Sequence, residues 1–343
     1  MQKVLLKTGK IIYPNNLKIK KKFRIGIIGS GKMAQNYIEV ISSYKHKVAA
    51  IVSLSNNYNA KKLAKKYNAE LFCDYKSAII NNKIVDAWII CCSWYEIAKC
   101  LKFFIKTNQP LLVEKSITLN SQKLQELYKK NKKNFSKILF AYNRNYYDFI
   151  FKLLRIINKN GLVYIEGKFF DQYQKIIKTK GTKIKKYLPY YITSHWIVMI
   201  LMIFKTLRIK ILEIKKEKIF GNKFDQMLLS FKLKFKNKHL YLKFYNLPNH
   251  PKNHSIEFYF EKKHLNISPI EKMNYIDNIN IIRGSNNKYL PQFRFDEVNQ
   301  KFKPGIRYLY YDFINNCFFN KKSYLKTDMR DLIKAYKICE KLN

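Results

Sequence analysis

The sequence predicts an α/β chain in two parts: an N-terminal doubly wound parallel sheet, and then an α+β region built on an open, mainly antiparallel sheet. Three observations lead to this fold class. A glycine-rich turn follows a short apolar run at 23–28, apolar runs alternate with helix-forming segments up to about residue 142, and longer alternating segments come after it. The length of 343 residues exceeds one ordinary domain and agrees with two.

The first part reads as a regular strand–helix alternation. Short apolar runs bounded by turn residues are typical of buried parallel strands. We expect strands at 23–28, 47–53, 69–72, 85–92, 110–113 and 137–141. We expect helices at 32–43, 59–67, 75–81, 95–107 and 121–133. Such an alternation places helices on both faces of a parallel sheet and a ligand crevice at the carboxyl ends of its strands.

The second part of the sequence has a different pattern of apolar residues. We expect helices at 147–158, 194–204, 304–319 and 328–342, the last with Thr327 as its N-cap. We expect strands at 162–170, 208–220, 225–236, 238–246 and 254–260, whose alternation indicates a sheet with one covered face. The predicted domains are therefore a basic extension at 1–22, a nucleotide domain at 23–142 and an α+β substrate and oligomerisation domain at 143–343.

The composition limits the possible partners. Lysine and arginine number 67 against 23 acidic residues, which gives a formal net charge of +44. Such an excess normally suggests a polyanion. Here the basic residues recur in nearly every segment, and abundant Lys, Asn, Ile, Tyr and Phe with scarce Gly and Pro are typical of AT-rich coding sequence. We therefore predict no specific nucleic-acid partner, and the charge favours anionic small molecules such as nucleotides.

Several further classes of site are not expected. The longest apolar run, Ile197–Phe204, is too short to span a bilayer, and the first ten residues lack the features of a secretory signal. We therefore predict a cytoplasmic protein with no membrane partner. The six cysteines form no Cys-x-x-Cys pair, so we expect reduced thiols. His250 and His254 have helical metal-ligand spacing, but Pro248 and Pro251 break up the segment, so we expect no metal site.

The turn after the first strand is the most informative motif. It reads Gly29-x-Gly31-x-x-Ala34: the first glycine permits a sharp turn, the second leaves room for a pyrophosphate, and the alanine lets the helix pack on the strand. The helix N-terminus adds free N–H groups and partial positive charge. The expected cofactor contacts here are Gly29, Ser30, Gly31, Lys32 and Met33. A turn that joins strand to helix without binding anything is the alternative.

The end of the second strand bears on the choice of cofactor. An acidic residue there would accept hydrogen bonds from the ribose of NAD, but the sequence reads Ser53-Leu54-Ser55-Asn56. Ser53 and Ser55 could contact either cofactor, and Lys61 or Lys62 could hold the additional phosphate of NADP. The expected cofactor is therefore NAD or NADP, and the choice stays open.

Three further segments accompany the glycine turn. Val113-Glu114-Lys115-Ser116 ends one strand, Tyr142-Asn143-Arg144-Asn145 ends the next, and Ser194-His195 opens an apolar helix. Together these motifs resemble the Gfo/Idh/MocA family of glucose–fructose and inositol oxidoreductases, in which a Rossmann domain precedes an α+β domain. The similarity runs from about Phe23 to the last helix. It includes Ile267–Lys272, which is similar to a segment of members in surface polysaccharide pathways.

The resemblance assigns roles to individual residues. Lys115 matches the lysine that hydrogen-bonds the reacting oxygen beside the nicotinamide, and His195 matches the general base for the substrate hydroxyl. Arg144 either meets a substrate carboxylate or phosphate or pairs with Glu114. The further expected cofactor contacts are Cys92, Ser93, Glu114 and Lys115, and the expected substrate contacts are Asn143, Arg144 and Tyr191. A surface lysine and a core histidine are the plain alternatives for Lys115 and His195.

Some positions depart from the family pattern. Ser116 replaces the proline of the Glu-Lys-Pro motif, and Ser93 and Ile97 replace a proline and a histidine that often follow the fourth main strand. Tyr191 and Val198 stand where relatives carry aspartate. These changes put the usual substrate and full activity in doubt.

The leading hypothesis is an NAD(P)-dependent oxidoreductase that moves a hydride between nicotinamide and a sugar, cyclitol or nucleotide sugar, with surface polysaccharide biosynthesis as a suggested setting. The resemblance also implies a dimer or tetramer formed through the open sheet. One alternative is a catalytically degenerate nucleotide-binding or regulatory protein of the same fold. Another is a polyanion-binding protein that uses the positive charge.

Overall fold

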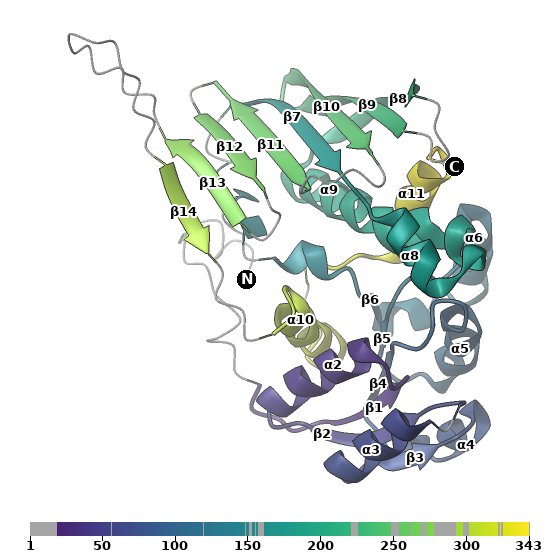
Figure 1. Ribbon diagram of the computed structural model, residues 1–343. Coiled ribbons are helices and arrows are strands. Elements are labelled where there is room, and N and C mark those ends of the chain that lie inside the picture. Colours follow the sequence, from purple (N-terminus) through teal and green to yellow (C-terminus); the bar gives the residue numbers. More distant parts are fainter. Residues whose placement is uncertain are drawn as a thin grey trace.

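Two sheets and their helices make up the structure, a computed structural model (Figure 1). It describes residues 19–55, 57–118, 120–147, 149–150, 153–154, 156, 161–220, 226–247, 254–261, 263–268, 272–277, 293–297, 302–321, 323 and 325–342. Four expectations lie wholly or partly outside the described residues: the extension up to residue 18, half of the helix at 147–158, His250, and the centre of the segment at 267–272.

The first sheet has six parallel strands in the order β3-β2-β1-β4-β5-β6, which confirms the predicted doubly wound sheet. Its strands are β1 (Arg24–Ile28), β2 (Lys47–Val52), β3 (Glu70–Phe72), β4 (Ala87–Ile90), β5 (Leu111–Val113) and β6 (Ile138–Phe140). Its helices are α2 (Lys32–Ser43), α3 (Tyr58–Tyr67), α4 (Tyr75–Ile80), α5 (Ile97–Phe104) and α6 (Ser121–Lys130). The strand order reverses between β1 and β4, where sheets of this kind bind ligands.

The second sheet has eight strands in the order β14-β13-β12-β11-β7-β10-β9-β8. They are β7 (Leu162–Phe169), β8 (Lys210–Phe220), β9 (Gln226–Phe235), β10 (Lys238–Asn246), β11 (Ser255–Phe260), β12 (Lys263–Ile267), β13 (Lys272–Asp277) and β14 (Phe293–Glu297). Neighbouring strands are antiparallel except β7 and β10, so the predicted open, mainly antiparallel sheet is confirmed. Strands β12 to β14 were not predicted.

The apolar helix α9 (Ser194–Leu207) covers one face of this sheet (Figure 1). Trp196 on α9 lies 4.6 Å, ring to ring, from Phe169 of β7, which in turn stacks on Phe244 of β10. With the π-helical turn before it, the helix runs over Pro189–Leu207, and its length and composition would suit a bilayer. However, 72% of it is buried inside the protein, so it serves as the core helix of the second part. The apolar run predicted at 197–204 is therefore shorter than the helix in the structure, which spans Pro189–Leu207.

Two local expectations need correction. A helix, α8 (Tyr173–Lys180), occupies a stretch for which no element was predicted. The last helix, α11 (Met329–Glu340), has Asp328 as its N-cap, because the Asp328 carboxylate accepts a hydrogen bond from the Asp331 N–H at 2.9 Å. Thr327 is not the cap; its hydroxyl accepts from the amide of Asn145 at 3.1 Å.

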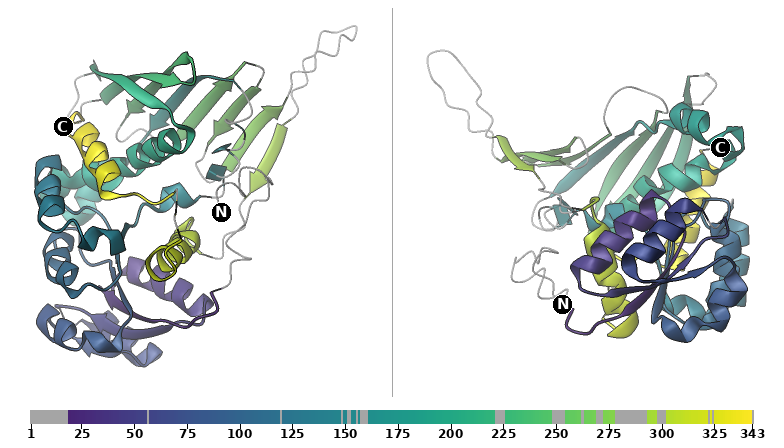
Figure 2. Two further views of the ribbon diagram at one scale, coloured as in Figure 1. Left: turned by 180° about the vertical axis from the view of Figure 1, so that it is seen from behind. Right: turned by 60° about the horizontal axis from the view of Figure 1, so that its bottom comes forward.

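Helix α10 (Ile306–Phe318) returns from the C-terminal part of the chain to the first sheet and packs against α2 (Figures 1 and 2). Phe318 stacks against Phe23 with ring centroids 4.3 Å apart, and the Tyr310 hydroxyl lies 2.6 Å from His46 Nδ1. Helix α11 packs against α9 and also against α6. The two parts of the chain therefore share helices at their boundary and form one packed unit.

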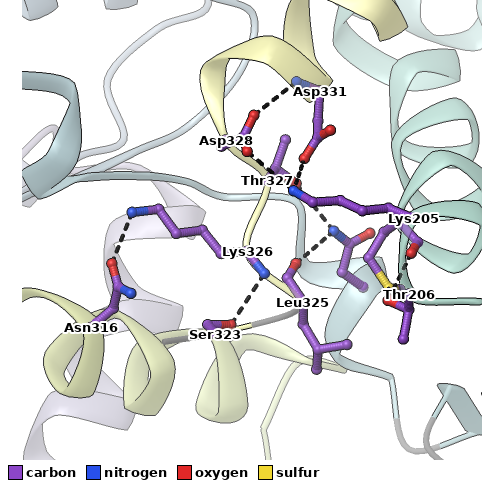
Figure 3. Close-up of polar contacts among 11 residues, drawn as sticks. Lys205, Thr206, Asn316, Ser323, Leu325, Lys326, Thr327, Asp328 and Asp331 are labelled. Atoms are coloured by element: carbon purple, nitrogen blue, oxygen red, sulfur yellow. Dashed lines mark hydrogen bonds and ion pairs between the residues drawn. The ribbon is translucent and has the colours of Figure 1, made fainter. Parts of the chain in front are cut away.

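The turn Asn143–Tyr146, which joins the two parts, is held by this returning segment. The Asn145 amide donates to the Leu325 carbonyl at 2.9 Å, and the Tyr146 hydroxyl donates to Asp312 at 2.7 Å. Figure 3 shows the next stretch, where Lys205 bridges Asp328 and Asp331 and Lys326 donates to Asn316 at 2.8 Å. The residues that position this turn thus lie about 160 to 180 positions away in sequence.

We predict that Asp312→Asn changes the pH dependence of stability. Burial raises the pKa of the Asp312 carboxyl to about 6, against the opposing effects of Ser323, Tyr146 and Lys326. The native state therefore binds this proton more tightly than the unfolded chain, so the group lowers the free energy of unfolding as pH rises from 4 to 7, by roughly 3 kcal/mol in all. The Tm of Asp312→Asn minus the Tm of the wild type should therefore rise by about 4 °C from pH 4 to pH 7, because only the wild type carries the titrating carboxyl.

Thermal melts of both proteins between pH 4 and pH 8 measure this effect. The control is Glu39→Gln, which removes an exposed carboxylate and should leave the trend unchanged. A Tm difference between Asp312→Asn and wild type that is the same at pH 4 and pH 7 would contradict the prediction.

Candidate active site

The glycine turn between β1 and α2 is shaped by two different requirements. Gly29 has φ of +118°, and a Cβ there would lie 2.8 Å from the Cys91 carbonyl oxygen, so only glycine fits. Gly31 is the N-cap of α2, and a Cβ there would meet nothing within 4 Å. Gly31 therefore borders open space, and no side chain caps the first N–H groups of α2.

This space is a cavity of about 720 Å³ at the carboxyl ends of β1, β2, β4 and β5. Twelve of the residues predicted to form the site line it: Gly29, Ser30, Gly31, Lys32, Met33, Ser53, Ser55, Cys92, Ser93, Glu114, Lys115 and Tyr191. Asn143, Arg144 and His195 are not among the described residues that line it. The glycine turn, the end of β2 and the Glu114–Lys115 segment therefore line one cavity.

Lys115 is held by a buried ion pair. Its ammonium lies 3.0 Å from Glu114 Oε2, and both side chains are about one-tenth exposed. The other oxygen of Glu114 accepts a hydrogen bond from the buried Tyr37 hydroxyl at 2.7 Å. Burial lowers the pKa of the Lys115 ammonium; Glu114 opposes this shift, and the positive charge of Lys303 adds to it. The peptide bond from Lys115 to Ser116 is cis.

His195, the second predicted catalytic residue, lies at the start of α9, near enough to Lys115 for that charge to affect its pKa. It is 8% exposed, and its ring packs edge-on against Tyr142 at 5.5 Å. Its Nδ1 atom has no hydrogen-bond partner among the described residues. Burial lowers the pKa of His195 well below its ordinary value of 6.5, and the charges of Lys115 and Arg144 add to this shift. The imidazole is therefore neutral at physiological pH.

Arg144 is positioned by an aromatic ring of α9. Its guanidinium carbon lies 3.3 Å from the centroid of Trp196, and the indole N–H donates to Asp171 at 3.1 Å. The buried Asp171 carboxylate also accepts from Thr193 at 2.6 Å. The neighbouring Asn143 amide donates to the Pro304 carbonyl at 2.9 Å. Asp171 and Trp196 were not predicted, because only the fold brings them to Arg144.

A second wall of the cavity comes from the other part of the chain. Lys180, at the end of α8, and Tyr191 both line it, with the Lys180 ammonium 5.2 Å from the Tyr191 ring centroid. Trp94, which follows β4, lines the cavity and packs against Tyr187 at 4.2 Å. Burial and the nearby Glu114 carboxylate raise the pKa of Tyr191. Lys180 and Trp94 belong to no recognisable motif and were missed.

The metal-ligand chemistry of the chain is limited. Within the described ranges, no three side chains of His, Cys, Asp and Glu gather as a metal site would require. His254 accepts a hydrogen bond from the Phe170 N–H at 3.0 Å through its Nδ1 atom. All six cysteines are free thiols.

The cavity fits a dinucleotide. Gly31 leaves the phosphate position free of a side chain, and the uncapped first turn of α2 offers backbone N–H donors to an anion. Hydroxyl and amide groups line the end of β2, while Lys115 stands at the end of β5. The order of the strands thus separates the glycine turn after β1, the polar groups after β2 and the ammonium after β5 along one crevice.

Comparison with protein families agrees with this geometry. Residues 23–142 match the Gfo/Idh/MocA model, which describes an oxidoreductase family with an NAD-binding Rossmann fold. A comparison with curated protein sequences gave no match.

Solved structures share the whole two-part fold. UDP-N-acetylglucosamine 3-dehydrogenase from Acidithiobacillus ferrooxidans is 11% identical with a TM-score of 0.68, over 94% of this chain and 97% of that one. Myo-inositol 2-dehydrogenase from Lactobacillus plantarum is 14% identical with a TM-score of 0.68, over 93% and 96%. A Gfo/Idh/MocA family oxidoreductase from Vibrio cholerae is 14% identical with a TM-score of 0.64, over 93% and 97%. At these identities the likeness concerns the fold.

We predict that Gly31→Leu mainly weakens cofactor binding, whereas Gly29→Ala mainly lowers stability. The Cβ of the leucine would meet nothing within 4 Å, so the substitution should cost about 1 kcal/mol of stability, as an apolar N-cap does. Because position 31 lines the cavity, the side chain should raise the Kd for NADH or NADPH at least about tenfold. The alanine would press on the backbone of β4 and should lower Tm strongly.

Cofactor fluorescence and thermal melting of the same samples separate these effects. Undiminished cofactor binding by Gly31→Leu would show that the dinucleotide does not pass over this turn.

Proposed function

We propose that this chain is an NAD(P)-dependent dehydrogenase or reductase acting on a CH–OH group, since residues 23–142 match the model of the Gfo/Idh/MocA family of NAD-binding oxidoreductases. One observation carries the proposal. The ammonium of Lys115, paired with the buried Glu114 carboxylate, lies on the wall of the same cavity as the glycine turn. This arrangement brings a hydrogen-bond donor of shifted pKa to a pocket that fits a dinucleotide.

The proposed substrate is a sugar, a cyclitol or a nucleotide sugar. Support comes from two structural relatives, one named as a dehydrogenase of UDP-N-acetylglucosamine and the other as a dehydrogenase of myo-inositol. The cavity wall offers aromatic rings at Trp94 and Tyr191 and a cation at Lys180, groups that suit a ring with polar substituents. Surface polysaccharide biosynthesis is the proposed setting.

In the proposed mechanism, a bound nicotinamide supplies or accepts the hydride. Lys115 donates a hydrogen bond to the oxygen of the reacting carbon and stabilises the negative charge that develops on it. Glu114 holds the ammonium in place, and its own position is fixed by Tyr37 on α2. The lowered pKa of Lys115 brings the ammonium closer to proton exchange at neutral pH.

His195 is proposed as the base that takes the hydroxyl proton during oxidation. Its neutral imidazole is available because burial and the charges of Lys115 and Arg144 lower its pKa. His195 is not among the described residues that line the cavity, so the substrate would extend from the cavity toward the start of α9. Asn143, Arg144 and Tyr191 are proposed substrate contacts along this path, with Arg144 held against Trp196.

We also propose a cytoplasmic protein that acts on a small molecule, with no specific nucleic-acid or membrane partner. The open eight-stranded sheet would serve as the interface of a dimer or tetramer. The proposed domain division, at 22/23 and 142/143, places the family match in the nucleotide domain.

A second candidate is a protein that binds the dinucleotide without turnover. It is favoured by Tyr191, which lines the cavity at a position where relatives carry an aspartate, and by Ser116 in place of the motif proline. Such a protein would bind cofactor and leave every sugar unchanged.

We predict that Lys115→Met lowers kcat by about 10²- to 10⁴-fold, because it removes the donor to the reacting oxygen. Cofactor affinity should change only a few-fold, since the glycine turn is untouched. The assay follows NAD(P)H absorbance with a panel of sugars, cyclitols and nucleotide sugars. Lys45→Met, a change at the exposed end of α2, is the matched control. Cofactor binding without turnover of any panel member by the wild type would favour the second candidate.

We predict that the pH profile of substrate oxidation lacks a break near 6.5. Because the His195 pKa is lowered in the folded protein, the imidazole stays neutral as pH falls from 8 through 6.5, and kcat/KM should not drop until lower pH. His195→Asn should lower kcat/KM throughout the range. An acid limb centred between 6.5 and 7 that disappears in His195→Asn would contradict the lowered pKa.

A further inference from the structure

A connected set of hydroxyl and amide groups lies where the cavity meets the end of β2. Ser53, Ser55 and Asn57 line the cavity there, and Ser30 of the glycine turn joins them from the side. Ser53 is buried, while Ser55 and Asn57 are exposed at the cavity edge. These groups face the pocket that lies beyond the phosphate cradle.

Two donors fix the orientation of the Asn57 side chain. The backbone N–H of Ala60 donates to Asn57 Oδ1 at 2.9 Å, and the Ser30 hydroxyl donates to the same oxygen at 3.2 Å. A backbone N–H cannot accept a hydrogen bond, so this atom must be the oxygen of the amide. The amide nitrogen therefore faces the other way and donates to Ser55 Oγ at 2.8 Å.

The direction of these hydrogen bonds determines whether Ser55 offers a ligand a donor or an acceptor. Because Ser55 Oγ accepts from Asn57, its own hydrogen is available to a group in the cavity or, at the long distance of 3.4 Å, to Ser53. Either way, one hydroxyl hydrogen of the Ser53–Ser55 pair is not used between the two serines and can be donated to a group in the cavity that both residues line. This wall of the cavity thus presents hydrogen-bond donors to a ligand.

Donors suit a phosphate better than a ribose diol. A phosphate accepts hydrogen bonds through every oxygen, whereas the diol of NAD is best bound by a carboxylate that accepts two hydrogen bonds. The two carboxylates of the cavity, Glu96 and Glu114, follow β4 and β5, and β1 separates those strands from β2. The first turn of α3, which starts beside this wall, carries no acidic residue.

We propose that the Ser53–Ser55–Asn57 wall binds the 2′-phosphate of NADP and so makes this chain prefer NADPH to NADH. The inference rests on the proposed function, in that the cavity must hold a nicotinamide dinucleotide. It assigns the selection to hydrogen-bond polarity and to the lack of a carboxylate among the described residues of this wall.

The test compares the Kd of NADPH with that of NADH for the full chain, measured by cofactor fluorescence. We expect NADPH to bind about ten- to a hundredfold more tightly, the range that one or two charge-assisted hydrogen bonds correspond to. Ser55→Asp should raise the Kd of NADPH at least about tenfold and leave or lower that of NADH, because it places an acceptor and a negative charge on this wall. Ser55→Ala should weaken NADPH alone.

Ser136→Asp is the matched control, since it adds the same charge at an exposed serine beside β6, at the opposite end of the sheet. It should not change the ratio of the two Kd values, which separates the local wall from the overall positive charge. Equal or tighter binding of NADH by the wild type would overturn the inference and leave the oxidoreductase proposal standing. Binding of neither dinucleotide would overturn both.

Discussion

The buried pair of Glu114 and Lys115 is the constraint on which the site depends. An ammonium this deep requires a close counter-charge, because an unpaired buried charge costs several kcal/mol. Glu114 provides it at 3.0 Å, and its second oxygen is bound by Tyr37 of α2. Since α2 is also the helix that begins at the glycine turn, this series of hydrogen bonds fixes Lys115 relative to that turn.

The turn that carries Arg144 depends on the return of the C-terminal segment to the first sheet. Gly305 has φ of +73°, and a Cβ there would lie 2.1 Å from the Asn143 carbonyl oxygen, so the chain passes in direct contact with the turn that carries Arg144. Helix α10 then packs on α2, and Asp312 and Leu325 bind Tyr146 and Asn145. Arg144 is thus positioned from both sides, by Trp196 of α9 and by a segment close to the C-terminus.

The sequence predicts the first sheet well because its signals are local. Each strand is a short buried run, and the carboxyl ends of parallel strands meet at one edge, so motifs at the ends of β1, β2 and β5 had to lie together. The fold class and the family resemblance are confirmed for this reason. The roles of the residues in that crevice remain predictions.

The missed elements depend on contacts that are distant in sequence. Helix α8 has only eight residues, too few to be stable alone, and its Ile176 and Ile177 pack in a small cluster with Trp94 from the other part of the chain. The cap of α11 falls on Asp328 because Thr327 is already bound to Asn145. Neither partner can be found from the local pattern.

The energetics of Lys115 bear on whether the chain only binds a dinucleotide. Replacing a buried ion pair by apolar residues is often neutral or stabilising, so stability alone gives no reason for a lysine and a glutamate here. A pure binding site would be served by the glycine turn and the polar wall at β2, neither of which needs a shifted ammonium. Burial and the Glu114 carboxylate raise the pKa of Tyr191, so its hydroxyl stays protonated and can donate a hydrogen bond at the cavity wall. The energetics of the buried pair therefore favour an enzyme over a protein that only binds the dinucleotide.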